Sequence, residues 1–176
     1  MDEAERLDAE ITRLLQSGRK EEAVALAEQL VALRETQLGP SAPQVGVAVN
    51  RLADLLRLNK QYERAQPLFA RALRILSAHF DRESQLQLAG GLKCWAQLHI
   101  ECEAYHDAAR LLRRARSIEL KLLEPKNVRP TLTLLALADL QRRVEDARAE
   151  RSYRLALRIF ERAYGPSHPL LSHPLH

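Results

Sequence analysis

The sequence repeats itself about every 42 residues, and this internal periodicity restricts the possible folds more than any other feature. When four segments are aligned at that spacing, alanine recurs in one column at intervals of 42, 43 and 41 residues, and two other apolar columns keep the same intervals. The columns are Ala23, Ala65, Ala108 and Ala149; Leu33, Ile75, Ile118 and Ile159; and Leu38, Phe80, Leu123 and Tyr164. A period of this length predicts an array of stacked structural repeats.

Each repeat has the pattern of two helices joined by a turn. In the second repeat, apolar residues from Leu52 to Leu56 form one stripe, the polar segment 59–61 interrupts it, and another stripe runs from Ala65 to Ile75 at helical spacing. We predict an all-α protein of about four helix-turn-helix repeats, 1–39, 40–80, 81–123 and 124–164, followed at 165–176 by an incomplete next repeat or a C-terminal tail. The eight helices are expected at about 2–16, 20–38, 42–58, 61–79, 82–101, 104–123, 127–142 and 145–164.

Small residues recur where the two helices of a repeat must cross. A missing side chain lets the helix axes approach to about 8 Å, while larger neighbours fill the space around the crossing. In the first repeat Ile11 and Leu30 stand at these places, which indicates an atypical end repeat or a wider crossing. In the other repeats we expect the crossing alanines to be buried: Ala65, Ala72, Ala108, Ala115, Ala149 and Ala156.

Three segments resemble a known family: LGPSAPQV at 38–45, YERAQPLFARAL at 62–73 and YGPSHP at 164–169. They are similar to the 42-residue tetratricopeptide repeats of kinesin light chains and their bacterial relatives, and the similarity extends over essentially the whole chain. The resemblance implies a right-handed α-solenoid whose first helices line a concave groove. It also implies a protein interaction scaffold or adaptor, which binds an extended peptide or a helix of a partner protein in that groove.

By position in these repeats, six side chains are expected to line the groove: Asn50, Asp54, Arg57, Lys93, Gln97 and Asp139. Asn50 ranks first because, in this family, an asparagine at that spacing can form two hydrogen bonds with the backbone of a peptide. Lys93 has the equivalent place one repeat later, and with Arg57 it could hold a carboxylate, although nearby aspartates would repel the same ligand. The alternative interpretation is a solvated polar helix face.

The sequence has no signature of catalysis or of cofactor binding. It contains no glycine-rich phosphate loop, no nucleophile elbow and no paired carboxylates in a predicted cleft. Cys94, His99, Cys102 and His106 lack the spacing of a zinc site. We therefore expect neither an enzyme nor a bound cofactor or metal.

Charge is distributed unevenly, which keeps two other classes of partner open. Residues 1–40 hold five basic and nine acidic side chains, whereas 41–176 hold 22 basic and 14 acidic. The acidic first repeat of one molecule could meet the basic end of another and form a homo-oligomer. Arginines on the second helices of the third and fourth repeats suggest a basic strip for nucleic acid or another acidic partner. Aromatic residues make up only 5% of the chain, which disfavours nucleic acid because little is left for base stacking.

The sequence favours a cytoplasmic protein without membrane contact. No segment approaches the roughly 18 apolar residues that a membrane-spanning helix needs. The first six residues, MDEAER, are mostly charged, unlike the start of a signal peptide. Two cysteines are too few for a disulfide framework, which fits a reducing compartment.

Overall fold

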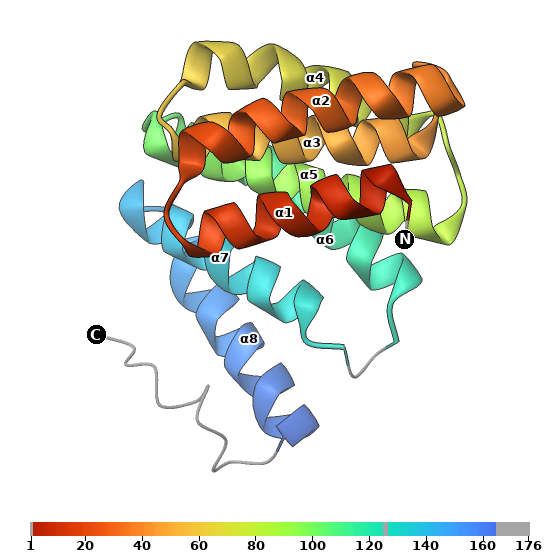
Figure 1. The fold of residues 1–176 in the computed structure, drawn as a ribbon. Helices are drawn as coiled ribbons and strands as arrows, with labels where there is room; N and C mark the ends of the chain where they lie inside the picture. Colours follow the sequence, from red (N-terminus) through yellow and green to blue (C-terminus); the bar gives the residue numbers. More distant parts are fainter. Residues whose placement is uncertain (1, 125–126, 165–176) are drawn as a thin grey trace. The chain divides into compact units, whose positions relative to one another are not determined.

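A computed structural model of the protein describes residues 2–124 and 127–164, and within these ranges it contains eight α-helices and no strand (Figure 1). The helices are α1 (Glu3–Gln16), α2 (Lys20–Leu38), α3 (Pro43–Leu58), α4 (Tyr62–Ser77), α5 (Arg82–Glu101), α6 (Tyr105–Leu122), α7 (Arg129–Arg143) and α8 (Arg148–Tyr164). The all-α prediction is confirmed, and each helix begins and ends within three residues of the expected position. The segment 165–176, predicted as an incomplete repeat or tail, lies outside the described residues.

Local sequence signals account for several helix ends. Asp2 and Glu5 form a capping box at the start of α1, where the Glu5 carboxylate accepts a hydrogen bond from the Asp2 backbone N–H at 3.0 Å. Gly39 ends α2 with a φ of 84°, a conformation that glycine adopts without steric cost. Pro43 begins α3, because the first turn of a helix does not need its missing N–H.

The turn inside each helix pair contains one residue with a left-handed backbone. Gly18 has this conformation in the first pair, with a φ of 76°, and Lys60, Glu103 and Glu145 have it in the next three, with φ of 59°, 58° and 54°. The conformation costs a non-glycine residue on the order of 1 kcal/mol. The same turn geometry therefore recurs at the period of the sequence, even where the glycine that would favour it is absent.

The chain divides into two compact blocks, which we call the N-terminal block (1–98) and the C-terminal block (from residue 99). In the N-terminal block α1 packs on α2, α2 on α3 and α3 on α4. Helix α5 joins them through Phe69 and Trp95, whose rings stack with centroids 6.4 Å apart. The largest fully buried side chains of this block include Phe69, Ile11 and Leu55.

In the C-terminal block α6 packs on α7 and α7 on α8. The buried apolar side chains include Leu112 of α6, Leu137 of α7 and Phe160 of α8. One polar contact is buried among them, because Glu119 of α6 is only 1% exposed and accepts a hydrogen bond from the Thr133 hydroxyl of α7 at 2.8 Å. This bond fixes α6 and α7 to each other, since a buried carboxyl without a partner would be costly.

The crossing alanines are buried as predicted, with one exception. Five of the six have no solvent exposure: Ala65, Ala72, Ala108, Ala115 and Ala156. Ala149 is half-buried, so the prediction is wrong there. It lies in the first turn of α8, where its neighbours Arg148 and Glu150 are exposed, whereas Ala156 in the middle of the helix is buried. Ile11 and Leu30, which replace small residues in the first repeat, are both buried.

Candidate functional site

Five of the six predicted groove residues lie on two helices of the N-terminal block. Asn50, Asp54 and Arg57 are one helical turn apart on α3, and Lys93 and Gln97 are one turn apart on α5. We call these five residues the α3/α5 set. Asp139 is an exposed residue of α7 in the C-terminal block, where its carboxylate accepts a hydrogen bond from the Tyr153 hydroxyl. The groove lined by all six residues stays a prediction.

Asn50 is the residue of this set with the most unusual surroundings. Its side chain is half-buried, and its Oδ1 atom is inaccessible to solvent although none of the described residues donates a hydrogen bond to it. The atom lies against Gly91 of α5, so close that a Cβ on that glycine would be 2.9 Å away. A buried acceptor without a donor costs about 1–3 kcal/mol, and native proteins contain few of them.

Cys94 is a member of the same cluster that sequence reasoning missed. Burial, with a smaller contribution from the negative charge of Asp54, raises the pKa of its thiol to about 11, although Arg57 and Lys93 act in the opposite direction. The Asn50 side-chain amide also donates a hydrogen bond to the sulfur, which acts to lower the pKa of the thiol. Cys94 is therefore a neutral hydrogen-bonding group at physiological pH. Sequence adjacency to Lys93 gave no signal for this position, because neighbouring residues of a helix do not lie on the same face.

The two thiols should differ strongly in reactivity. Cys102 is exposed, whereas Cys94 is half-buried with a pKa near 11. Because the thiolate is the reacting species, we expect Cys94 to react with a disulfide reagent at pH 8 at least roughly a hundredfold more slowly than an unperturbed thiol. The measurement is the time course of thiol modification, which should show one fast and one slow phase. The slow phase should vanish in Cys94→Ser and become fast in denaturant; two equally fast phases in the folded protein would contradict this.

The ionic groups of the α3/α5 set partly neutralise one another. Arg57 Nε donates a hydrogen bond to Asp54 Oδ1 at 2.8 Å, and the two side chains are only 12% and 30% exposed. A ligand carboxylate would have to compete with Asp54 for this guanidinium. The pairing therefore disfavours a carboxylate clamp built on Arg57 and Lys93.

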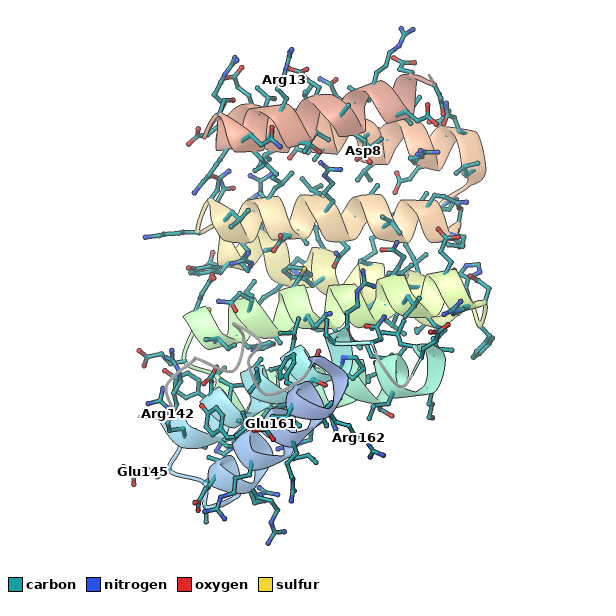
Figure 2. The ribbon with its side chains drawn as sticks, turned by 90° about the horizontal axis from the view of Figure 1, so that it is seen from below. Asp8, Arg13, Arg142, Glu145, Glu161 and Arg162 are labelled. Atoms are coloured by element: carbon teal, nitrogen blue, oxygen red, sulfur yellow. The ribbon has the colours of Figure 1, made fainter. Side chains whose placement is uncertain are left out.

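A second polar connection ties α1 to α3. Arg51 Nη1 donates to Asp8 Oδ1 at 2.5 Å, and its Nη2 donates to the Asp8 carbonyl oxygen at 3.1 Å and to Thr12 Oγ1 at 2.6 Å. Asp8 is thereby bound to α3, while Arg13 of the same helix points away into solvent (Figure 2). Sequence reasoning missed the role of Arg51, because its partners lie about one full repeat earlier in the chain.

The arginines that suggested a basic strip are partly paired. Arg110 bonds Asp107 at 2.9 Å, Arg148 bonds Asp146 at 2.8 Å, and Arg154 bonds Glu150 at 2.6 Å. The Arg148 guanidinium and backbone N–H hold the pKa of Asp146 at about 2, so this carboxylate stays charged at any physiological pH. The pairs reduce the positive potential that a nucleic acid would require.

Two tetratricopeptide repeat family models match the sequence, one over residues 13–78 and the other over 133–170, together more than half of the chain. The protein is a tetratricopeptide repeat protein. Repeats of this family are generally modules for protein–protein interaction, and most members are not enzymes. No curated protein sequence matches the chain.

Solved structures of tetratricopeptide repeat proteins share its fold. The nearly identical TPR-like repeats of Podosopora anserina that are named after kinesin light chain are 21% identical, with a TM-score of 0.82, over 97% of this chain and 82% of that one. BtubC (BKLC) from P. vanneervenii is 18% identical, with a TM-score of 0.79, over 94% of this chain and 66% of that one. The structural neighbours of this tetratricopeptide repeat protein are thus kinesin-light-chain-like. None of its described helices is long and apolar enough to cross a membrane.

Proposed function

We propose that the protein is an interaction scaffold that binds an extended or helical segment of a partner protein on the α3/α5 set. The observation that carries the proposal is the buried Oδ1 of Asn50, an acceptor for which the described part of the chain supplies no donor. Peptide recognition by repeat proteins uses such side-chain amides, which can accept from and donate to a peptide backbone at the same time. Asp139 would provide a separate contact on α7.

The free energy of the unpaired Asn50 Oδ1 atom supports this function. In the structure the Asn50 Oδ1 atom is a buried acceptor without a donor. If the side chain rotates away from Gly91, this oxygen can accept a hydrogen bond from a backbone N–H of the ligand. The ligand would then gain the hydrogen bond, and the protein would lose an unfavourable arrangement. Because Asp54 and Arg57 neutralise each other, this contact is directed mainly at the backbone and should depend little on salt.

The test begins with a pull-down that compares the wild type with the Asn50→Ala, Lys93→Ala double variant, and continues with titration of any partner that only the wild type retains. Asn50→Ala should weaken binding of that partner roughly 5- to 150-fold, the equivalent of about 1–3 kcal/mol. The loss should be similar at low and high salt, because the contact is not primarily ionic.

A matched control carries the changes Arg154→Ala and Arg158→Ala on α8, in the other block. It should bind the same partner as the wild type does. If affinity is instead unaffected by the Asn50 and Lys93 changes but is lost in the α8 variant and at high salt, the α3/α5 proposal fails and binding of an acidic partner to the arginines takes its place.

A further inference from the structure

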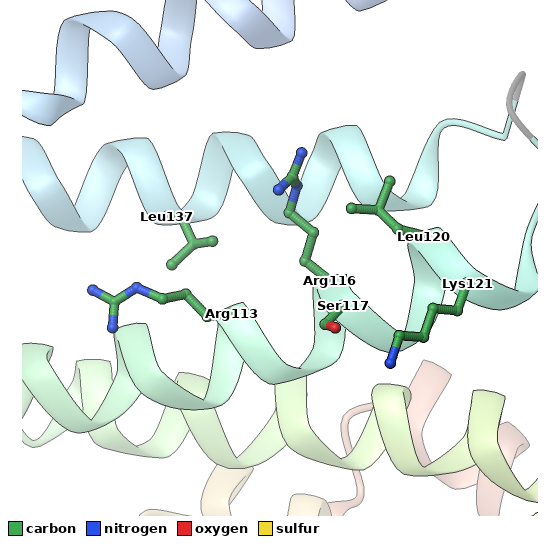
Figure 3. Close-up of a pocket in the computed structure, with 6 residues that line it drawn as sticks. All are labelled: Arg113, Arg116, Ser117, Leu120, Lys121 and Leu137. Atoms are coloured by element: carbon green, nitrogen blue, oxygen red, sulfur yellow. The ribbon is translucent and has the colours of Figure 1, made fainter.

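A pocket of about 430 Å³ lies in the C-terminal block and has no part in the function proposed above (Figure 3). Five of its six lining residues come from α6 and one comes from α7. They are Arg113, Arg116, Ser117, Leu120 and Lys121 of α6, and Leu137 of α7. Ligand sites usually measure about 300–1,000 Å³, so the pocket can receive a bulky group of another molecule.

The wall of the pocket is mainly apolar, although three of its residues are cationic. Leu120 is 54% exposed, and Leu137 contributes from α7. The Arg116 side chain extends from α6 across α7, and its Nε atom is inaccessible to solvent, so its methylene stem is packed against the helices. Long cationic side chains cover apolar surface in this way. An apolar group that entered the pocket would therefore remove Leu120 from water.

The cationic ends surround the pocket and do not meet inside it. Figure 3 shows the charged ends of Arg113, Arg116 and Lys121 pointing to different sides. Arg113 and Lys121 are exposed. One anion cannot contact groups that diverge in this way, but each exposed group can pair with a different carboxylate. An apolar centre with a charged, solvated rim is the usual anatomy of a protein interaction site.

The nearby acidic groups are engaged elsewhere, so the rim keeps its positive charge. Glu119 of α6 is buried and hydrogen-bonded to α7. Asp146 lies within the electrostatic influence of Arg113, but Arg148 binds both of its carboxylate oxygens. Within the described ranges, no ion pair involves Arg113 or Lys121, and no lining residue is acidic.

We propose that this pocket is a docking site for an acidic segment of a partner protein, which inserts one bulky apolar side chain between α6 and α7. The inserted side chain lies against Leu120 and Leu137, and acidic residues on either side of it pair with Arg113 and Lys121. The uncompensated positive charge selects an acidic segment. None of the lining residues is aromatic, so the pocket offers no ring on which the base of a nucleic acid could stack.

The probes are short synthetic peptides that differ only in the features the proposal names. The first has a central leucine between glutamates, the second has alanine in place of the leucine, and the third has glutamines in place of the glutamates. Each is titrated into the full chain, and the amide NMR signals of α6 and α7 should shift in a saturable manner with the first. The alanine peptide should bind roughly 5- to 20-fold more weakly, because it buries less apolar surface. The glutamine peptide should bind roughly 3- to 10-fold more weakly and lose the dependence on salt.

Variants of the chain locate the site. Ser117→Phe fills the pocket without a change of charge, and it should reduce the affinity for the leucine peptide to that for the alanine peptide. Arg113→Gln combined with Lys121→Gln should weaken binding of the leucine peptide roughly 3- to 10-fold. The matched control combines Arg151→Gln with Arg158→Gln, which removes the same charge from exposed positions of α8 outside the pocket. It should change the affinity by less than about twofold.

Circular dichroism should show that the variants keep the helical content of the wild type; if Ser117→Phe does not, Leu120→Ser replaces it. The proposal is overturned if the leucine peptide does not bind, or if it binds no more tightly than the alanine peptide. Equal weakening by the two charge variants would also overturn it and would indicate a general surface for polyanions, nucleic acid included. Asn50→Ala should leave this binding unchanged, because Asn50 lies on α3 in the other block, so failure of the function proposed above would be a separate result.

Discussion

Replacement of Phe69 by alanine is expected to lower the free energy of unfolding by about 3–5 kcal/mol, the range typical of truncating a buried aromatic side chain. Phe69 has no solvent exposure and is, by volume, the largest fully buried side chain among the described residues. Its ring stacks on Trp95 with an angle of 13° between the planes and a centroid distance of 6.4 Å, within the range of favourable aromatic pairs. The variant would lose both the burial and the ring contact that joins α4 to α5.

The measurement is urea unfolding followed by circular dichroism and by the fluorescence of Trp95, the only tryptophan of the chain. Trp95 reports directly on the altered contact, so its native emission should also change in Phe69→Ala. Phe80→Ala is a suitable control, because Phe80 is 88% exposed and its removal should alter stability by no more than about 0.5 kcal/mol. Similar losses in the two variants would show that the stacked pair does not stabilise the N-terminal block.

The contrast between these two phenylalanines shows how far repeat periodicity can predict the structure. The period located the helices and the crossing alanines, because helix packing itself repeats along the chain. Phe80 belongs to an aligned apolar column, yet α4 ends at Ser77 and leaves Phe80 in the following loop. An aligned column fixes the position of a residue within the repeat, whereas its burial depends on where the local helix ends.

The candidate site was predictable to a similar extent. Helical spacing was sufficient to put Asn50, Asp54 and Arg57 on α3, because a helix returns to the same face every three or four residues. It could not show that Arg51 binds Asp8, or that the Asn50 oxygen lies against Gly91. These contacts join residues about 40 apart in the sequence and depend on side-chain conformations that only the packed helices determine.

The contact between Asn50 and Gly91 leads to the second large expected effect. A Cβ at position 91 would lie 2.8 Å from Leu73 Cδ2 and 2.9 Å from Asn50 Oδ1, both shorter than van der Waals contact. Valine adds two further methyl groups in the same direction. We therefore expect Gly91→Val to cost roughly 1–3 kcal/mol of stability, as is typical of overpacked interiors, because Leu73 and Asn50 would both have to move.

The neighbouring glycine offers a control with the same chemical change. Gly90 also lies within α5, but a Cβ there would have no neighbouring atom within 4 Å. Valine forms helix more readily than glycine does, so Gly90→Val should be neutral or stabilising by a few tenths of a kcal/mol. The same gain in helix propensity applies at position 91, so the difference in unfolding free energy between the two variants isolates the packing at α3 and α4. Equal midpoints in urea would mean that α5 does not approach Asn50 as closely as the structure shows, and the proposed role of Asn50 would lose its structural basis.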